Sequence, residues 1–139
     1  MMIVVVLVVR LVVDATNFIT ASEPSAQAFK TATLLKTLSV NSLILGEVGV
    51  GKKSLAKYIL PDATVIEASN FDELLSALES VNEIIIINLE NSPNIKRVVD
   101  AIKTNSVRVV ATAKNSFVNE YIDDIFSVKF GIPPLRDRL

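Results

Sequence analysis

Apolar positions follow two different spacings along the chain, and the two alternate regularly. Short runs made almost wholly of apolar residues occur at 42–45, 64–68, 83–87, 107–112 and 126–130. Segments in which apolar residues recur every three or four positions lie at 24–38, 52–60, 70–80, 93–105 and 116–125. The first spacing predicts buried strands, and the second predicts amphipathic helices.

The order of these elements predicts the class of fold. Single helices separate the strands, and runs such as Ile84–Ile87 have no polar side at all. Strands of this kind are buried on both faces, which is typical of a parallel sheet between two helical layers. Residues that favour helix ends lie at the expected boundaries: Pro24 and Asn70 suit helix starts, and Pro61 suits a helix end. We therefore expect an α/β, three-layer domain.

The first thirteen residues, "MMIVVVLVVRLVV", are apolar except for Arg10. Such a run is too short to cross a bilayer as a helix. It has neither the preceding positive charge nor the cleavage site of a signal peptide. Its valines favour a strand in the core or at a sheet edge, with an added tail as the alternative. We expect residues 1–13 to form this separate segment and residues 14–139 to form the domain.

The composition of the chain excludes several classes of function. The chain has 139 residues, is half hydrophobic and carries a net charge of −1, which predicts one globular domain without an electrostatic footprint for nucleic acid. It contains no Cys and no His. This excludes thiol chemistry, histidine general bases and Cys/His zinc sites, and it is compatible with a reducing cytoplasm. We expect a cytoplasmic protein that binds no membrane.

One motif in the sequence is typical of a ligand-binding site. Gly46, four residues, Gly51 and Lys52 have the spacing of a phosphate-binding P-loop and lie between an expected strand and an expected helix. Glycines let backbone N–H groups face a phosphate, the helix N-terminus attracts it, and the lysine adds a cation. The alternative is an ordinary turn. The candidate nucleotide-binding residues are Gly46, Glu47, Val48, Gly49, Val50, Gly51, Lys52, Lys53 and Ser54.

Four segments also resemble one P-loop family, the sigma-54-dependent (NtrC-type) transcriptional regulators of the AAA+ class. "GEVGVGKK" (46–53) is similar to that family's "GESGTGKE", which also lacks a hydroxyl residue after the lysine. "VRVVATAKNSF" (107–117) resembles its sensor strand "VRVIAATNRDF". "IPPLRDRL" (132–139) resembles "LPPLRERxEDI", and "SEPSAQAF" (22–29) resembles the entry to its first helix.

The resemblance implies an AAA+ α/β subdomain with a five-stranded parallel sheet in the order 5-1-4-3-2, plus an extra N-terminal strand if residues 1–13 form one. It also implies ATP or ADP as the ligand. The family's helical lid and its DNA-binding helix-turn-helix are not found in this sequence. DNA would therefore be bound only through a domain outside this chain, and the implied partners are copies of the chain or another transcription regulator.

The chain departs from the family pattern at the metal site and at the sigma-54 contact. The "GAFTGA" loop, which contacts sigma-54, is not found between residues 60 and 82. The family's Walker B Asp-Glu pair, which serves Mg²⁺ and the attacking water, corresponds to Asn88-Leu89-Glu90. Glu90 comes one position late unless the strand end bulges, so both a catalytic and a merely solvated Glu90 remain open. Mg²⁺ is weakly supported, since Lys53 replaces its hydroxyl ligand.

Two further departures concern positive charge. The family's two arginine positions fall on Val118 and Asp124, while Arg108 and Arg136 sit elsewhere and are expected to be structural or surface residues. The family's sensor Thr-Asn falls on Ala113 and Lys114, for which we expect a solvated lysine. These losses favour a degenerate nucleotide-binding domain of a transcriptional regulator, with little or no hydrolysis. The alternatives are an active oligomeric ATPase that uses Glu90, and a different P-loop ATPase such as a clamp-loader relative.

Overall fold

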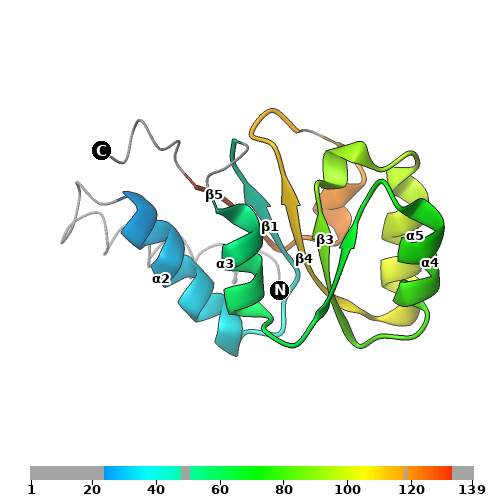
Figure 1. Ribbon diagram of the computed structural model, residues 1–139, viewed down its shortest axis with the longest axis horizontal. Helices are drawn as coiled ribbons and strands as arrows, with labels where there is room; N and C mark the ends of the chain where they lie inside the picture. The colour runs from blue at the N-terminus through cyan, green and yellow to red at the C-terminus, as the bar shows by residue number, and fades with distance from the viewer. Residues whose placement is uncertain (1–23, 48–50, 118, 133–139) are drawn as a thin grey trace.

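The computed structural model describes residues 24–47, 51–117 and 119–132. Five parallel strands form one sheet in the order β2-β3-β4-β1-β5 (Figure 1). This is the expected order 5-1-4-3-2, and each strand begins and ends within two residues of its expected bounds. The strands are β1 (Ser42–Leu45), β2 (Thr64–Glu67), β3 (Glu83–Ile87), β4 (Arg108–Ala113) and β5 (Val128–Gly131).

Helices cover both faces of the sheet, as the apolar strands require. They are α2 (Pro24–Thr37), α3 (Lys52–Ile59), α4 (Phe71–Leu78) and α5 (Ile95–Asn105). Helices α2 and α3 pack on one face, over Ile44, Val110 and Val128, which we call the α2/α3 face. Helices α4 and α5 pack on the other, over Leu43 and Val109, which we call the α4/α5 face. The result is the three-layer α/β architecture that the sequence predicts.

The helix starts differ in how they are capped. Asn94 lies before α5, and its side chain accepts a hydrogen bond from the N–H of Arg97 at 3.1 Å. Asn70, which the sequence suggests as a cap for α4, lies at the expected position but makes no side-chain cap bond. Acidic residues Asp72 and Glu73 in the first turn of α4 favour that end through the helix dipole instead.

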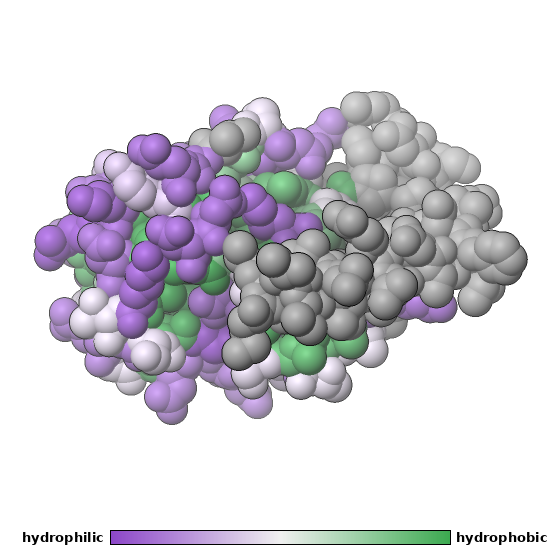
Figure 2. Space-filling model, turned by 180° about the vertical axis from the view of Figure 1, so that it is seen from behind, coloured by the Kyte–Doolittle hydropathy of each residue, from purple (hydrophilic) through white to green (hydrophobic). Residues whose placement is uncertain are grey.

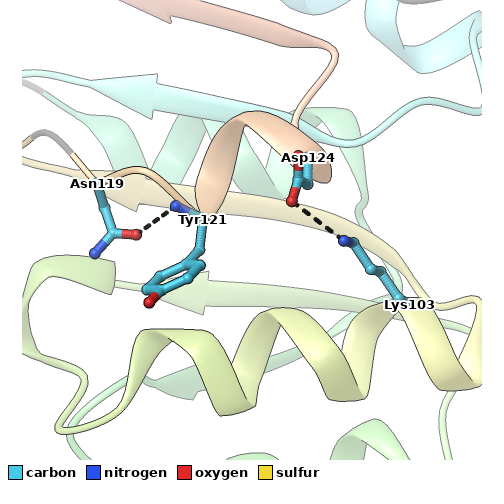
Figure 3. A network of polar contacts seen from close by, with 4 residues as sticks. All are labelled: Lys103, Asn119, Tyr121 and Asp124. Carbon is cyan, nitrogen blue, oxygen red and sulfur yellow. Dashed lines mark hydrogen bonds and ion pairs between the residues drawn. The ribbon is translucent and has the colours of Figure 1, made fainter.

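The predicted helix at 116–125 is wrong. The described residues of this stretch, 116–117 and 119–125, form turns and one short 3₁₀ helix, η2 (Ile122–Asp124). The Asn119 side chain accepts the N–H of Tyr121 at 2.8 Å, a local bond that competes with helix formation (Figure 3). Ile122 and Ile125 still reach the α4/α5 core. Their three-residue spacing fits a 3₁₀ turn as well as an α-helix, which is why the sequence pattern is misleading here.

The outer surface of the described residues is mostly polar. On the side shown in Figure 2, hydrophilic residues cover most of the described surface, and hydrophobic ones show in patches between them. No helix among the described residues is long and apolar enough to cross a membrane. Residues 1–13, for which the sequence favours a strand, lie outside the described residues, so that expectation stays a prediction.

Candidate functional site

The candidate site lies where the parallel strands end. Leu45, the last residue of β1, is in register with Ala113 of β4 and Gly131 of β5. After β1 the chain passes through Gly46 and Glu47 and enters α3 at Lys52. The N-terminus of α3 therefore faces the carboxyl edge of the sheet, which is where the strand–loop–helix geometry of a P-loop places a phosphate.

Gly51 allows the chain to enter α3. It lies in the left-handed region, with φ of 95° and ψ of 23°. A residue with a side chain would be strained there, although a Cβ would meet no atom within 4 Å. Gly46 is buried and its N–H donates to the carbonyl of Ala113 at 3.1 Å, so it ties the start of the loop to β4.

Lys52 is the central cation of this edge. The residue is 8% exposed, and its Nζ donates to the carbonyl of Gly46 at 2.7 Å and to that of Ala113 at 3.3 Å. Burial lowers the pKa of Lys52 below its ordinary value, and the negative charge of Glu90 opposes this shift. The lysine thus lies across the ends of β1 and β4, with its charge held by backbone carbonyls.

Glu90 reaches the same edge through a turn that its position in the sequence does not reveal. Asn88 follows β3 in the left-handed conformation, with φ of 56° and ψ of 60°, and leads into the 3₁₀ helix η1 (Leu89–Asn91). The Glu90 carboxylate then accepts the N–H of Lys114 at 3.3 Å. Its effect on the pKa of Lys52 places its charge near that amine. A catalytic role for Glu90 stays a prediction.

The side chain of Asn88 contacts a neighbouring strand rather than pointing freely into the site. Its Nδ2 donates to the Glu67 carboxylate at 3.3 Å, and its backbone N–H donates to the Thr112 hydroxyl at 2.9 Å. Sequence reasoning missed Glu67 and Thr112. Both are polar residues at or next to the carboxyl ends of strands β2 and β4, and that position at a parallel-sheet edge is the signal that points to them.

The remaining predicted loop residues divide into two groups. Lys53 and Ser54 are exposed in the first turn of α3, and Glu47 is half-buried. Val48, Gly49 and Val50 lie outside the described residues, so their contact with a phosphate stays a prediction. The structure thus brings Gly46, Lys52 and Glu90 together at one edge, and the binding of a phosphate by these residues stays a prediction.

Asp124, which stands at a family arginine position, and Arg108, for which we expect a structural or surface role, lie away from this edge. Asp124 forms an ion pair with Lys103 at 3.3 Å (Figure 3). Both residues of this pair line a hollow of about 520 Å³ with Asn41, Arg108 and Ser127, at the opposite, amino edge of the sheet.

Arg108 donates from Nη2 to the carbonyls of Leu35 and Leu38, each at 2.6 Å, and is therefore structural, as expected. Val118 and Arg136 lie outside the described residues.

The donors present suit phosphate better than a protein-bound metal ion. Over the described part of the chain, no group of three or more carboxylate, His or Cys side chains is arranged to hold a metal. Lys53 stands where a hydroxyl would bind Mg²⁺, and the neutral Asn88 amide is hydrogen-bonded to Glu67. The set does not fit a Mg²⁺ shell of the ordinary P-loop kind.

Comparison with known proteins supports the fold. No protein-family model and no curated protein sequence matches this chain. The structure of C. elegans PCH-2 is similar, with a TM-score of 0.50 and 15% sequence identity over 86% of this chain. The chain spans 42% of the length of the PCH-2 chain, and identity this low shows the fold alone. Strand order and this similarity together show a three-layer α/β fold with a five-stranded parallel sheet, consistent with the fold of P-loop NTPases.

Proposed function

We propose that this chain is a degenerate AAA+ domain that binds ATP or ADP through residues 46–54 and hydrolyses ATP slowly or not at all. The observation that carries the proposal is the position of Lys52. Its ammonium group lies at the carboxyl edge, beside the N-terminus of α3 and within 2.7 Å of the carbonyl of Gly46. A phosphate at this edge would meet a cation, a helix N-terminus and a glycine-bounded loop.

Phosphate also offers Lys52 a better partner than the two carbonyls it now contacts. A buried ammonium group is stabilised more by an anion than by neutral oxygens, since charge-assisted bonds are roughly twice as strong as neutral ones. The desolvation that lowers the pKa of Lys52 is compensated when a phosphate supplies negative charge. Binding is therefore favoured by the electrostatics around Lys52 itself.

Weak hydrolysis follows from what surrounds the phosphate position. Phosphoryl transfer depends on metal ions and positive charge that neutralise the γ-phosphate as the bond breaks. Lys53 supplies no oxygen for Mg²⁺, and Asn88 supplies no charge. Asp124, which the resemblance aligns with an arginine of the family, lies at the amino edge, paired with Lys103, and so supplies no positive charge at the phosphate position. These residues favour a nucleotide that acts as a structural or switching ligand.

A role in transcription regulation rests on the sequence resemblance alone. The resembling stretch at 107–117 covers β4, and α2 begins within the one at 22–29. Between α3 and β3 the described chain holds only β2, α4 and their connections, so no sigma-54-contacting loop is inserted there. We therefore propose a regulatory module that acts on copies of itself or on another regulator, with any DNA contact made outside this chain.

A second candidate function is favoured by the position of Glu90. Its carboxylate lies near Lys52 and accepts the N–H of Lys114, so an acid is present at the edge where a water-polarising group would be needed. In this alternative, the chain is an active ATPase that completes its site in an oligomer.

Two measurements test the proposal. Calorimetric titration of the chain with ATP and ADP, with and without Mg²⁺, should show binding of both nucleotides that does not require the metal. Phosphate release should stay below about 10⁻³ s⁻¹, close to an intrinsic turnover without a complete catalytic set. Turnover that requires Mg²⁺, disappears in Lys52→Ala and falls in Glu90→Gln would replace the proposal by the active ATPase.

A further inference from the structure

Strand β5 has one open side. Among the described residues it lies at the end of the sheet and pairs with β1 alone. The N–H of Val128 donates to Asn41 at 3.4 Å, and that of Ile132 donates to Leu45 at 2.8 Å. Since alternate residues of a parallel strand face the same neighbour, the N–H groups of Lys129 and Gly131 face away from β1. An edge of this kind is a template for another strand.

The crossovers of this fold all have one hand. Helix α3 carries the chain across the α2/α3 face from β1 toward the β2 end of the sheet. Helices α4 and α5 carry it across the α4/α5 face in the opposite direction, from β2 to β3 and from β3 to β4. The η2 connection also lies on that face and leads from β4 past β1 to β5. Nearly all such connections in proteins are right-handed, so one hand throughout is expected.

The same rule locates a strand preceding α2. Ala32 and Leu35 of α2 lie in the α2/α3 core with Ile44 and Val128. A crossover on this face moves toward the β2 end, as α3 does. A parallel strand that leads through α2 into β1 must therefore start on the β5 side of β1. Because β5 occupies the place next to β1, the strand would lie beyond β5, along its open side.

We propose that residues 1–13 supply a sixth strand, parallel to β5 and paired with its outer edge. The residues of this run are apolar apart from Arg10 and most of them are Val, the composition of a strand that is covered on its faces. The ten residues 14–23 link it to α2 and can span up to about 33 Å when extended. A sheet and its covering helix layer lie only about 10 Å apart.

The direction of the proposed sixth strand relative to β5 follows from the position of α2. Arg108, at the amino edge of the sheet, holds the carbonyls of Leu35 and Leu38 at the end of α2, so α2 begins toward the carboxyl edge. A parallel strand ends at that same edge, close to Pro24. An antiparallel one would end at the far edge, and the linker would have to run back along the whole sheet.

Amide hydrogen exchange tests this pairing with internal controls. In the full chain, the N–H groups of Lys129 and Gly131 should exchange as slowly as those of Val128 and Phe130, which face β1. Deletion of residues 1–13, or Val6→Pro in the full chain, should accelerate exchange at Lys129 and Gly131 at least tenfold and leave the two inward-facing amides unchanged. Fast exchange at Lys129 and Gly131 in the full chain overturns the proposal, and so does protection that survives both changes.

Cross-linking provides a second test that does not require a disrupted strand. The chain has no cysteine, so single Cys substitutions at residues 4–8 can each be combined with Lys129→Cys. Intramolecular disulfides should form at alternate positions, since successive side chains point to opposite faces. Disulfides without this alternation, or disulfides that link two chains and increase with concentration, overturn the proposal; the latter would show that a second copy covers the edge.

Discussion

The environment of the Lys52 ammonium group favours the binding of the proposed ligand. Lys52 is a buried residue, and its ammonium group contacts two carbonyl oxygens rather than a carboxylate. A charge in such a place is stabilised less than in water, which is why its pKa is lowered. The same arrangement prepares it for an anion, because only a phosphate or a similar group would restore full stabilisation.

This burial predicts how stability depends on pH. In the unfolded chain Lys52 keeps its proton up to an ordinary pKa of 10.5, whereas the folded chain releases it at lower pH. Between these two pKa values the unfolded state binds more protons, so the free energy of unfolding gains a contribution that rises with pH. The stability of the unmodified chain relative to Lys52→Met should therefore increase from neutral pH toward 10.5. Urea denaturation measures it, and a constant difference would contradict the burial of the charge.

The backbone of Asn88 supports a second prediction at this scale. Asn88 lies in the left-handed region, which residues with a Cβ adopt at a cost of about 1 kcal/mol and glycine adopts freely. We expect Asn88→Ala to be less stable than Asn88→Gly by about 1 kcal/mol in urea denaturation. At the nearby Asn91, whose φ is not positive, glycine should be no more stable than alanine. The same order at both positions would contradict the turn that brings Glu90 to the site.

At the level of elements, one arginine fastens a helix to the sheet. Arg108 begins β4, and its Nη2 donates to two carbonyls at the end of α2. Hydrogen bonds from a charged donor contribute about 1.5 to 3 kcal/mol. We expect Arg108→Met to lower the free energy of unfolding by about 2 kcal/mol, partly offset by removal of a buried Nε that has no partner.

Arg97 provides the matched control for this prediction. It lies exposed on α5, and Arg97→Met should change stability by no more than about 0.5 kcal/mol. Equal losses in the two variants, measured by thermal or urea unfolding, would show that the bonds from Arg108 do not hold α2 in place.

Elements with strong apolar patterns could be predicted from the sequence, and those that depend on local polar bonds could not. The strand at Glu83–Ile87 is apolar over four successive residues and has no alternative to burial. At 116–125 the pattern was compatible with a helix, but the bond from Tyr121 to Asn119 favours a turn. The same limit applies to Glu90, whose approach to Lys52 depends on a left-handed Asn88 that no spacing reveals.

At the scale of the whole molecule, the sheet order and the hand of its crossovers place the glycine loop and Lys52 at the carboxyl end of β1. Ligands of open parallel sheets bind outside the carboxyl ends of the strands, where the order reverses. Here β1 lies between β4 and β5, so the loop after it opens at that reversal. The fold therefore places the proposed phosphate-binding residues of the chain at the position where such folds bind ligands.

The central claim is that this loop binds nucleotide through Lys52. Its most direct test is calorimetric titration of ATP into the unmodified chain and into two matched variants. Lys52→Ala and Lys53→Ala remove the same charge from adjacent positions, one buried at the strand ends and one exposed. We predict at least a tenfold loss of affinity for Lys52→Ala, since a charge-assisted bond contributes about 1.5 to 3 kcal/mol, and little change for Lys53→Ala. Equal losses in both variants, or no binding by the unmodified chain, would contradict the claim.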